Sequence, residues 1–199
     1  MEKNINLKEI ERKVYTLYHE DGIIDIFAGA WILVFGILAI RTDRVWVAGM
    51  FPVYGLALFV AIKKKITVPR IGYMKFNHRQ KSKIEKVFFS IHIVIYSFAI
   101  LLYTHNTPSW IDTLFQEYPM LFFGAIVTLF FIVAVWTLNI RRFYAYALLT
   151  LIVSIGGHMI DTDVSYGVFP VLLGVLIMSA GVLMLNQFLQ KYPVQMEVK

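Results

Sequence analysis

The stretch that decides the fold is residues 23–40, IIDIFAGAWILVFGILAI, in which Asp25 is the only ionisable side chain. About 20 mostly apolar residues in a helix are enough to cross the hydrocarbon core of a bilayer. The whole chain of 199 residues is 58% hydrophobic and 16% charged, whereas soluble domains average about 45–50% and 25%. A soluble core of this size has no room for the surplus, so the sequence predicts a membrane protein.

Six apolar runs of this kind predict an all-α polytopic membrane protein whose six transmembrane helices pair as three helical hairpins. The predicted spans are 23–40, 45–62, 87–104, 119–138, 143–160 and 164–189. The chain then divides into a polar segment 1–22, a membrane domain 23–190 with a basic loop at 63–86, and a tail 191–199. Trp31 lies in the middle of its span, away from both membrane surfaces, which predicts that it packs between helices.

The distribution of basic residues predicts the orientation of the chain. If both termini are cytosolic, 17 of the 19 Lys and Arg residues lie on the cytosolic side, as the positive-inside rule requires. Lys63, Lys64 and Lys65, which begin the long inner loop, are interpreted as charges that only orient the chain. We therefore expect a bacterial or archaeal cytoplasmic membrane protein with both termini in the cytosol.

The N-terminal segment 1–22 carries a helical apolar stripe formed by Leu7, Ile10, Val14 and Leu17. Spacings of three and four place these side chains on one face of a helix, which predicts an amphipathic cytosolic helix. This helix is expected to lie on the membrane surface, to pack on a cytosolic loop or on a second copy of the chain, or to recruit a partner.

The loop sequence TVPRIGYMKF, residues 67–76, combines aromatic and basic side chains where water is available. Pro69 favours extended geometry at the preceding Val68. Arginine binds phosphate bidentately, so the loop is a candidate site for an anionic lipid or phosphate. The candidate ligand-binding residues are Arg70, Tyr73, Lys75 and Arg79. Two alternatives stay open: non-specific contact of basic residues with anionic lipid headgroups, and docking of a protein.

The same loop resembles a pattern in small prokaryotic six-helix membrane proteins, which have a cytosolic loop of the T-V-P-R-I-G-Y type and no assigned activity. The residues that carry the resemblance are Asp21, Gly22, Asp25, Gly29, Pro69, Arg70, Gly72 and Tyr73. The three-hairpin plan is also similar to the HdeD-like membrane proteins in hydropathy and glycine placement. The resemblance implies the six-helix fold but no reaction.

Two ionisable residues, Asp25 and His92, lie within predicted spans at similar depths from the inner side. Charges inside a bilayer are costly and point to a function, and histidine titrates near physiological pH. The pair is therefore a candidate for proton-linked chemistry. The alternative is that Asp25 stabilises the start of its helix through the helix dipole while His92 is a packing residue.

A second candidate site, for a metal or other cation, lies at the outer side. Its residues are His105, His158, Asp161 and Asp163. His158 and Asp161 are three residues apart and share a helical face, and imidazole and carboxylate are common ligands. The alternative is an ordinary acidic outer loop.

The sequence excludes several classes of function. The chain has no cysteine, which excludes disulfides, thiol catalysis and Cys-ligated metals. No nucleophile elbow or phosphate-binding glycine loop occurs, and neither a cofactor nor nucleic acid is expected. The first hypothesis is a membrane protein that binds or transports a small solute or lipid, and anionic lipids are its expected partners.

Two alternatives to that hypothesis are a scaffold or sensor that engages a cytosolic partner through segment 1–22 and loop 66–80, and a small lipid-acting enzyme. Glycine and alanine in the first and sixth spans permit close helix packing. This packing would serve either a homodimer or the fold of the single chain.

Overall fold

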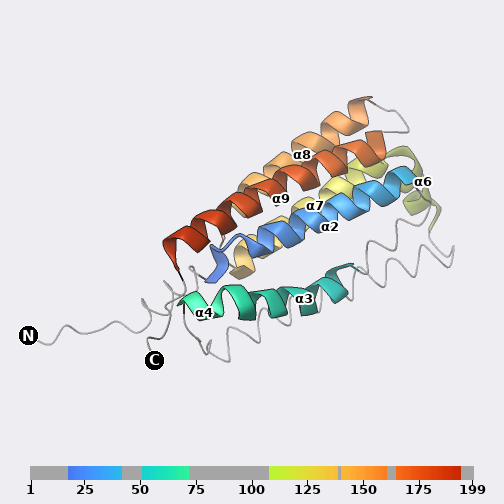
Figure 1. Cartoon of the computed structure of the whole chain (residues 1–199). Coiled ribbons are helices and arrows are strands. Elements are labelled where there is room, and N and C mark those ends of the chain that lie inside the picture. The colour runs from blue at the N-terminus through green and yellow to red at the C-terminus, as the bar shows by residue number, and fades with distance from the viewer. Residues whose placement is uncertain (1–17, 42–50, 72–107, 139, 161–164, 194–199) are drawn as a thin grey trace, which may run out of the picture.

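The computed structural model describes residues 18–41, 51–71, 108–138, 140–160 and 165–193. This part of the chain is helical and contains no strand (Figure 1), which confirms the all-α class. The helices in chain order are α2 (Ile23–Arg41), α3 (Phe51–Ile66), α4 (Val68–Ile71), α6 (Ser109–Glu117), α7 (Pro119–Leu138), α8 (Phe143–Ile160) and α9 (Ser165–Lys191).

Four of the described helices are long and apolar enough to cross a membrane, namely α2, α7, α8 and α9. They correspond to the predicted spans 23–40, 119–138, 143–160 and 164–189. The 16-residue helix α3 covers most of the predicted span 45–62, whereas 87–104 lies outside the described residues. The apolar helices indicate a membrane protein, and the count of six spans stays a prediction.

Among the described helices, α2 and α9 have the most extensive contact; they run antiparallel, and three glycines of one segment face three of the other. On α2 and the turn before it these are Gly22, Gly29 and Gly36, and on α9 they are Gly181, Gly174 and Gly167. A Cβ added at Gly29 would lie 2.7 Å from the carbonyl oxygen of Gly174. The two backbones therefore touch, as small residues permit in membrane helix pairs.

The second close pair is α7 with α8, which are consecutive helices joined by a short turn. Ser154 of α8 occupies the space that a side chain at Gly124 of α7 would need. Phe131 of α7 is fully buried and its ring contacts those of Phe143 and Tyr146 on α8. Shape complementarity and aromatic contacts hold this pair together.

Apolar side chains fill the space between the two pairs. Ile32, Phe131, Leu173 and Ile177 are buried members of one continuous core. Trp31 contacts Phe130 with ring centroids 5.5 Å apart, which confirms that it packs between helices. Many outward-facing side chains are also large and apolar. A surface of large apolar side chains is suited to the hydrocarbon core of a membrane.

The two most extensive contacts among the described helices are not those of the predicted hairpins. Neither α2 with α9 nor α7 with α8 is a predicted hairpin, although α8 also contacts α9 and α2 contacts α3 less extensively. The predicted partner of α7 lies in 87–104, outside the described residues. The three-hairpin plan therefore stays a prediction. The glycines of the first and sixth spans, for which a homodimer or packing within one chain is expected, pack within one chain in this structure.

The start of the basic loop differs from the prediction. Helix α3 continues to Ile66, and Val68–Ile71 forms one further helical turn rather than extended chain. The carbonyl of Thr67 accepts the N–H groups of both Arg70 and Ile71, which closes this turn. Pro69 is tolerated because a proline in the first turn of a helix interrupts no main-chain hydrogen bond.

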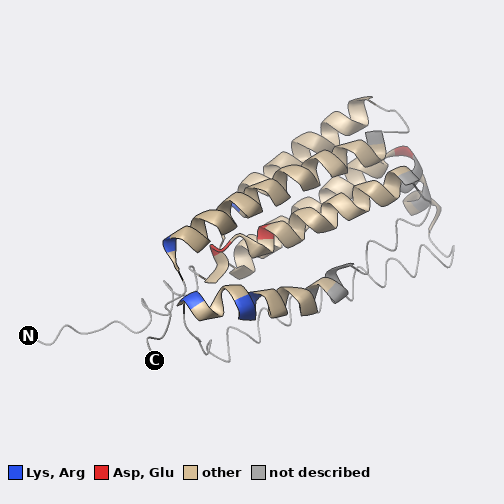
Figure 2. Cartoon of the chain, in the orientation of Figure 1, with Lys and Arg blue, Asp and Glu red and all other residues tan. Residues whose placement is uncertain are grey.

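Basic residues gather at one end of the bundle, which we call the basic end (Figure 2). Its described Lys and Arg residues lie at the C-terminal ends of α3 and α9, in α4 and before α8: Lys63, Lys64, Lys65, Arg70, Arg141, Arg142 and Lys191. Arg41, which ends α2, lies at the opposite end with Glu117 and Tyr118. This asymmetry agrees with the pattern on which the predicted orientation rests.

Candidate functional site

The site is built around the turn that leads into α2. Residues 18 and 19 are helical, residues 20–22 turn, and α2 begins at Ile23. Gly22 has a φ of 73° and its α-carbon faces the backbone of Gly181 on α9. Only glycine adopts that conformation readily and leaves room for so close an approach. The turn thus places Asp21 and Asp25 beside three other helical segments.

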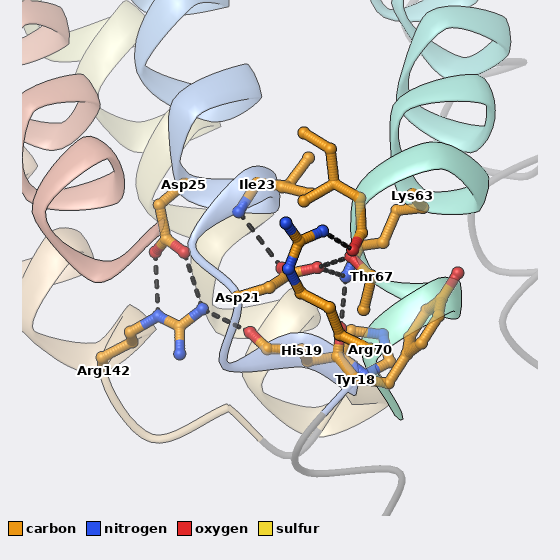
Figure 3. Close-up of polar contacts among 10 residues, drawn as sticks. Tyr18, His19, Asp21, Ile23, Asp25, Lys63, Thr67, Arg70 and Arg142 are labelled. Carbon is orange, nitrogen blue, oxygen red and sulfur yellow. Dashed lines mark hydrogen bonds and ion pairs between the residues drawn. The ribbon is translucent and has the colours of Figure 1, made fainter. Parts of the chain in front are cut away.

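The first carboxylate, Asp21, is fully buried between α2, α3 and the start of α4 (Figure 3). Its Oδ2 lies 2.8 Å from Lys63 Nζ and accepts a hydrogen bond of 2.5 Å from the Thr67 hydroxyl. Its Oδ1 accepts the main-chain N–H of Ile23 at 3.2 Å. Lys63 is itself only 1% exposed. The ion pair is therefore desolvated on both sides, and hydrogen bonds satisfy the remaining carboxylate positions.

The second carboxylate, Asp25, is also fully buried and binds Arg142, which stands just before α8. Arg142 Nε donates to Oδ1 at 2.9 Å, and Nη2 donates to Oδ2 at 2.6 Å. This is the paired geometry that makes arginine–carboxylate contacts strong.

Each cation also binds one main-chain carbonyl of the residues before the turn. Lys63 Nζ donates to the carbonyl oxygen of Tyr18, and Arg142 Nη2 donates to that of His19 at 2.6 Å. Figure 3 shows the two cations on opposite sides of the turn. Carbonyls at the end of a helical turn carry partial negative charge and attract cations. Lys63 and Arg142 thus attach the end of the N-terminal segment to α3 and α8, and we call this arrangement the double clamp.

Tyr18 adds a ring contact to the double clamp. Lys63 Nζ lies 4.1 Å from the centre of the Tyr18 ring, a position in which a cation is attracted to the aromatic face. Burial, and next the negative charge of Asp21, raise the pKa of the Tyr18 hydroxyl. The phenol therefore stays neutral at physiological pH.

Arg70 lies beside the cluster, and within the described residues its guanidinium has no carboxylate partner. Its Nη1 donates to the carbonyl oxygen of Ile66 at 2.6 Å, four residues earlier. Its Nε is buried and has no hydrogen-bond acceptor among the described residues. Within the part of the chain that the structure describes, Arg70 is thus a cation at the basic end that uses one of its donors, Nη1, in a hydrogen bond.

The predicted site residues are placed as follows. Asp25 binds Arg142, and its predicted partner His92 lies outside the described residues. Of the loop residues, Arg70 lies beside the double clamp, while Tyr73, Lys75 and Arg79 lie outside the described part of the chain. His158 lies at the opposite end against the ring of Tyr118, with centroids 5.3 Å apart. Among the predicted cation ligands, His105, Asp161 and Asp163 lie outside the described residues.

Two observations indicate what the site can do chemically. No group of three potential metal ligands occurs among the residues that the structure describes. In the double clamp two carboxylates face two cations, which balances the charge of the site. The arrangement is suited to holding segments together.

Sequence reasoning did not assign roles to Lys63, Arg142 or Thr67. The orientation prediction includes both cations among the orienting charges, and for Lys63 that interpretation is incomplete because the side chain is buried against Asp21. One signal was available in the sequence, since Asp21 and Asp25 are one helical turn apart at the entry to an apolar run. Buried acids need cations, but their partners lie 42 and 117 residues farther along the chain.

Comparisons with protein families, with curated proteins and with solved structures find no match to this chain.

Proposed function

We propose that this protein is a membrane-embedded scaffold or sensor that presents its N-terminal segment, together with the segment after α4, to a partner protein in the cytosol. The double clamp is the observation that carries the proposal. Lys63 and Arg142 use costly buried charges to fix the chain at Tyr18 and His19, next to α3 and α8. A free N-terminal tail would need no such attachment.

The packing of the described helices supports this proposal over solute transport. A transport path requires polar groups that cross the middle of the membrane domain. The space between α2, α7 and α9 is instead filled by apolar residues such as Ile32, Phe131 and Leu173. Asp25, the acid expected to serve transport, is held at the basic end by Arg142. The proposal also takes the basic end to be cytosolic, in a bacterial or archaeal membrane.

Site-specific photo-crosslinking in living cells tests the proposal. The photoreactive residue replaces Glu20, which is exposed beside the double clamp, and in matched controls it replaces Tyr118 at the opposite end or the outward-facing Leu148. We expect a discrete protein adduct at position 20, and only lipid or no adduct at 118 and 148. Equal adducts at all three positions, or none at 20, would count against a partner at the basic end.

A second variant separates loss of the partner from loss of the fold. Arg142→Met removes one half of the double clamp and leaves the other half intact. In a variant that still inserts and purifies as wild type does, we expect the position-20 adduct to decrease at least several-fold. An undiminished adduct would show that the double clamp does not serve presentation.

A further inference from the structure

Among the described cations at the basic end that the double clamp does not use, Arg70 has a buried donor, its Nε. A guanidinium is always charged and offers five N–H donors in a planar fork. One hydrogen bond to Ile66 O satisfies part of this capacity, and the buried Nε has no acceptor among the described residues. Buried donors of charged groups are normally paired, so this fork calls for an acceptor.

The carboxylates of the double clamp do not meet that need. Asp21 already accepts from Lys63, Thr67 and the Ile23 N–H, and Asp25 is occupied by Arg142. Because Asp21 and Asp25 are each neutralised by their own cation, and Glu20 is the one further acid that the structure describes at this end, the described Lys64, Lys65 and Arg70 give the basic end a surplus of positive charge. An approaching anion therefore meets a net positive site despite the nearby acids.

The surroundings of Arg70 indicate which anion fits. Lys64 and Lys65 are exposed on the last turn of α3, where the apolar part of that helix has ended. At this depth a bilayer presents its headgroup phosphates. A planar guanidinium matches two oxygens of a phosphate group, and nearby lysines raise the local concentration of anions.

We infer that Arg70 anchors a binding site for a phosphate group, with Lys64 and Lys65 providing supporting positive charge. A phosphate diester in a phospholipid headgroup and a free phosphate present the same oxygens to the guanidinium. This inference does not depend on the proposed scaffold role.

Native mass spectrometry of the full chain in detergent, titrated with phosphatidylglycerol or phosphatidylcholine, tests the inference. Three variants are compared with wild type: Arg70→Gln, Arg70→Lys and Lys64→Gln. We expect Arg70→Gln to weaken retention of phosphatidylglycerol about tenfold, the value for one charge-assisted contact. Arg70→Lys keeps the charge but loses the planar fork of donors, so its retention of phosphatidylglycerol should lie between that of Arg70→Gln and that of wild type. Lys64→Gln removes the same charge from an exposed position, and should weaken retention less than about threefold.

Competition with inorganic phosphate distinguishes the two sources. If millimolar phosphate displaces the lipid from wild type, the site accepts free phosphate, and if it does not, the site is specific for the headgroup. Equal retention by wild type and Arg70→Gln, or equal losses in Arg70→Gln and Lys64→Gln, would overturn the inference. Among the described residues Arg70 makes one hydrogen bond, to Ile66 O within its own segment, so Arg70→Gln should unfold close to the wild-type temperature, which guards against a result caused by misfolding.

Discussion

The ion pair between Asp25 and Arg142 provides a quantitative test of the double clamp through a double-mutant cycle. Arg142→Met leaves a fully buried carboxylate without its cation, which should lower the free energy of unfolding by about 3–5 kcal/mol. Asp25→Asn should cost less, about 1.5–3 kcal/mol. The reason is that Arg142 is 20% exposed and keeps its bond to the His19 carbonyl.

The double variant, Asp25→Asn with Arg142→Met, should cost less than the sum of the single variants. Two hydrogen bonds of 2.9 and 2.6 Å join the side chains, and coupling energies of residues in contact are about 0.5–3 kcal/mol. The assay is reversible unfolding in mixed micelles, followed by the fluorescence of Trp31, which is packed against Phe130; the other three tryptophans of the chain are replaced by Phe in every protein compared.

Arg141→Met is the matched control, because Arg141 is adjacent in sequence but exposed. It should change the free energy of unfolding by no more than about 0.5 kcal/mol. Additive effects of Asp25→Asn and Arg142→Met, within about 0.5 kcal/mol, would refute the reasoning, since the two side chains would then not interact in the folded protein.

Three further predictions concern the packing and the other half of the double clamp. Gly29→Ala pushes a Cβ into the α9 backbone and should lower the free energy of unfolding in micelles by about 1–3 kcal/mol. A Cβ at Gly156 meets no atom within 4 Å, so the control variant Gly156→Ala should be neutral or stabilising. Equal effects of the two variants would contradict the contact between the α2 and α9 backbones. Lys63→Met should cost about 3–5 kcal/mol and the exposed Lys64→Met less than about 0.5 kcal/mol, so equal losses would argue against a buried Lys63. The raised pKa of Tyr18 means that the folded state retains this proton more tightly than the unfolded chain, so the free energy of unfolding should fall as the pH rises above about 10. In Tyr18→Phe this fall should be shallower, and identical pH curves for the two proteins would refute the assignment.

The membrane class could be predicted from sequence because it depends on the length and apolarity of local segments. The predicted spans 23–40, 119–138 and 143–160 match α2, α7 and α8 within one residue. The ends of these helices depend on the local sequence, because a hydrocarbon core requires main-chain groups to be hydrogen-bonded within the helix. The main-chain geometry after α3 was less predictable, because Pro69 is compatible with both extended chain and a first helical turn.

Hydropathy does not predict which helices touch, because lipid and protein interiors are equally apolar; the glycine and alanine residues of the first and sixth spans predict close packing but not whether it occurs within one chain. The pattern that pairs α2 with α9 is the spacing of glycines by seven residues, at 22, 29 and 36 and at 167, 174 and 181. A seven-residue repeat keeps small residues on one helix face. Lys63 and Arg142 were likewise indistinguishable from orienting charges until the structure placed them against buried acids.

Electron paramagnetic resonance at position 20 tests the double clamp most directly. The chain contains no cysteine, so Glu20→Cys carries the single spin label, and Met159→Cys at the opposite end reports on the integrity of the bundle. The attachment of residues 18 and 19 predicts slow motion of the label at position 20, and sharp, fast spectra there after Lys63→Met with Arg142→Met, while the label at 159 stays unchanged. Identical spectra at position 20 with and without the two cations would contradict the claim that they hold this segment.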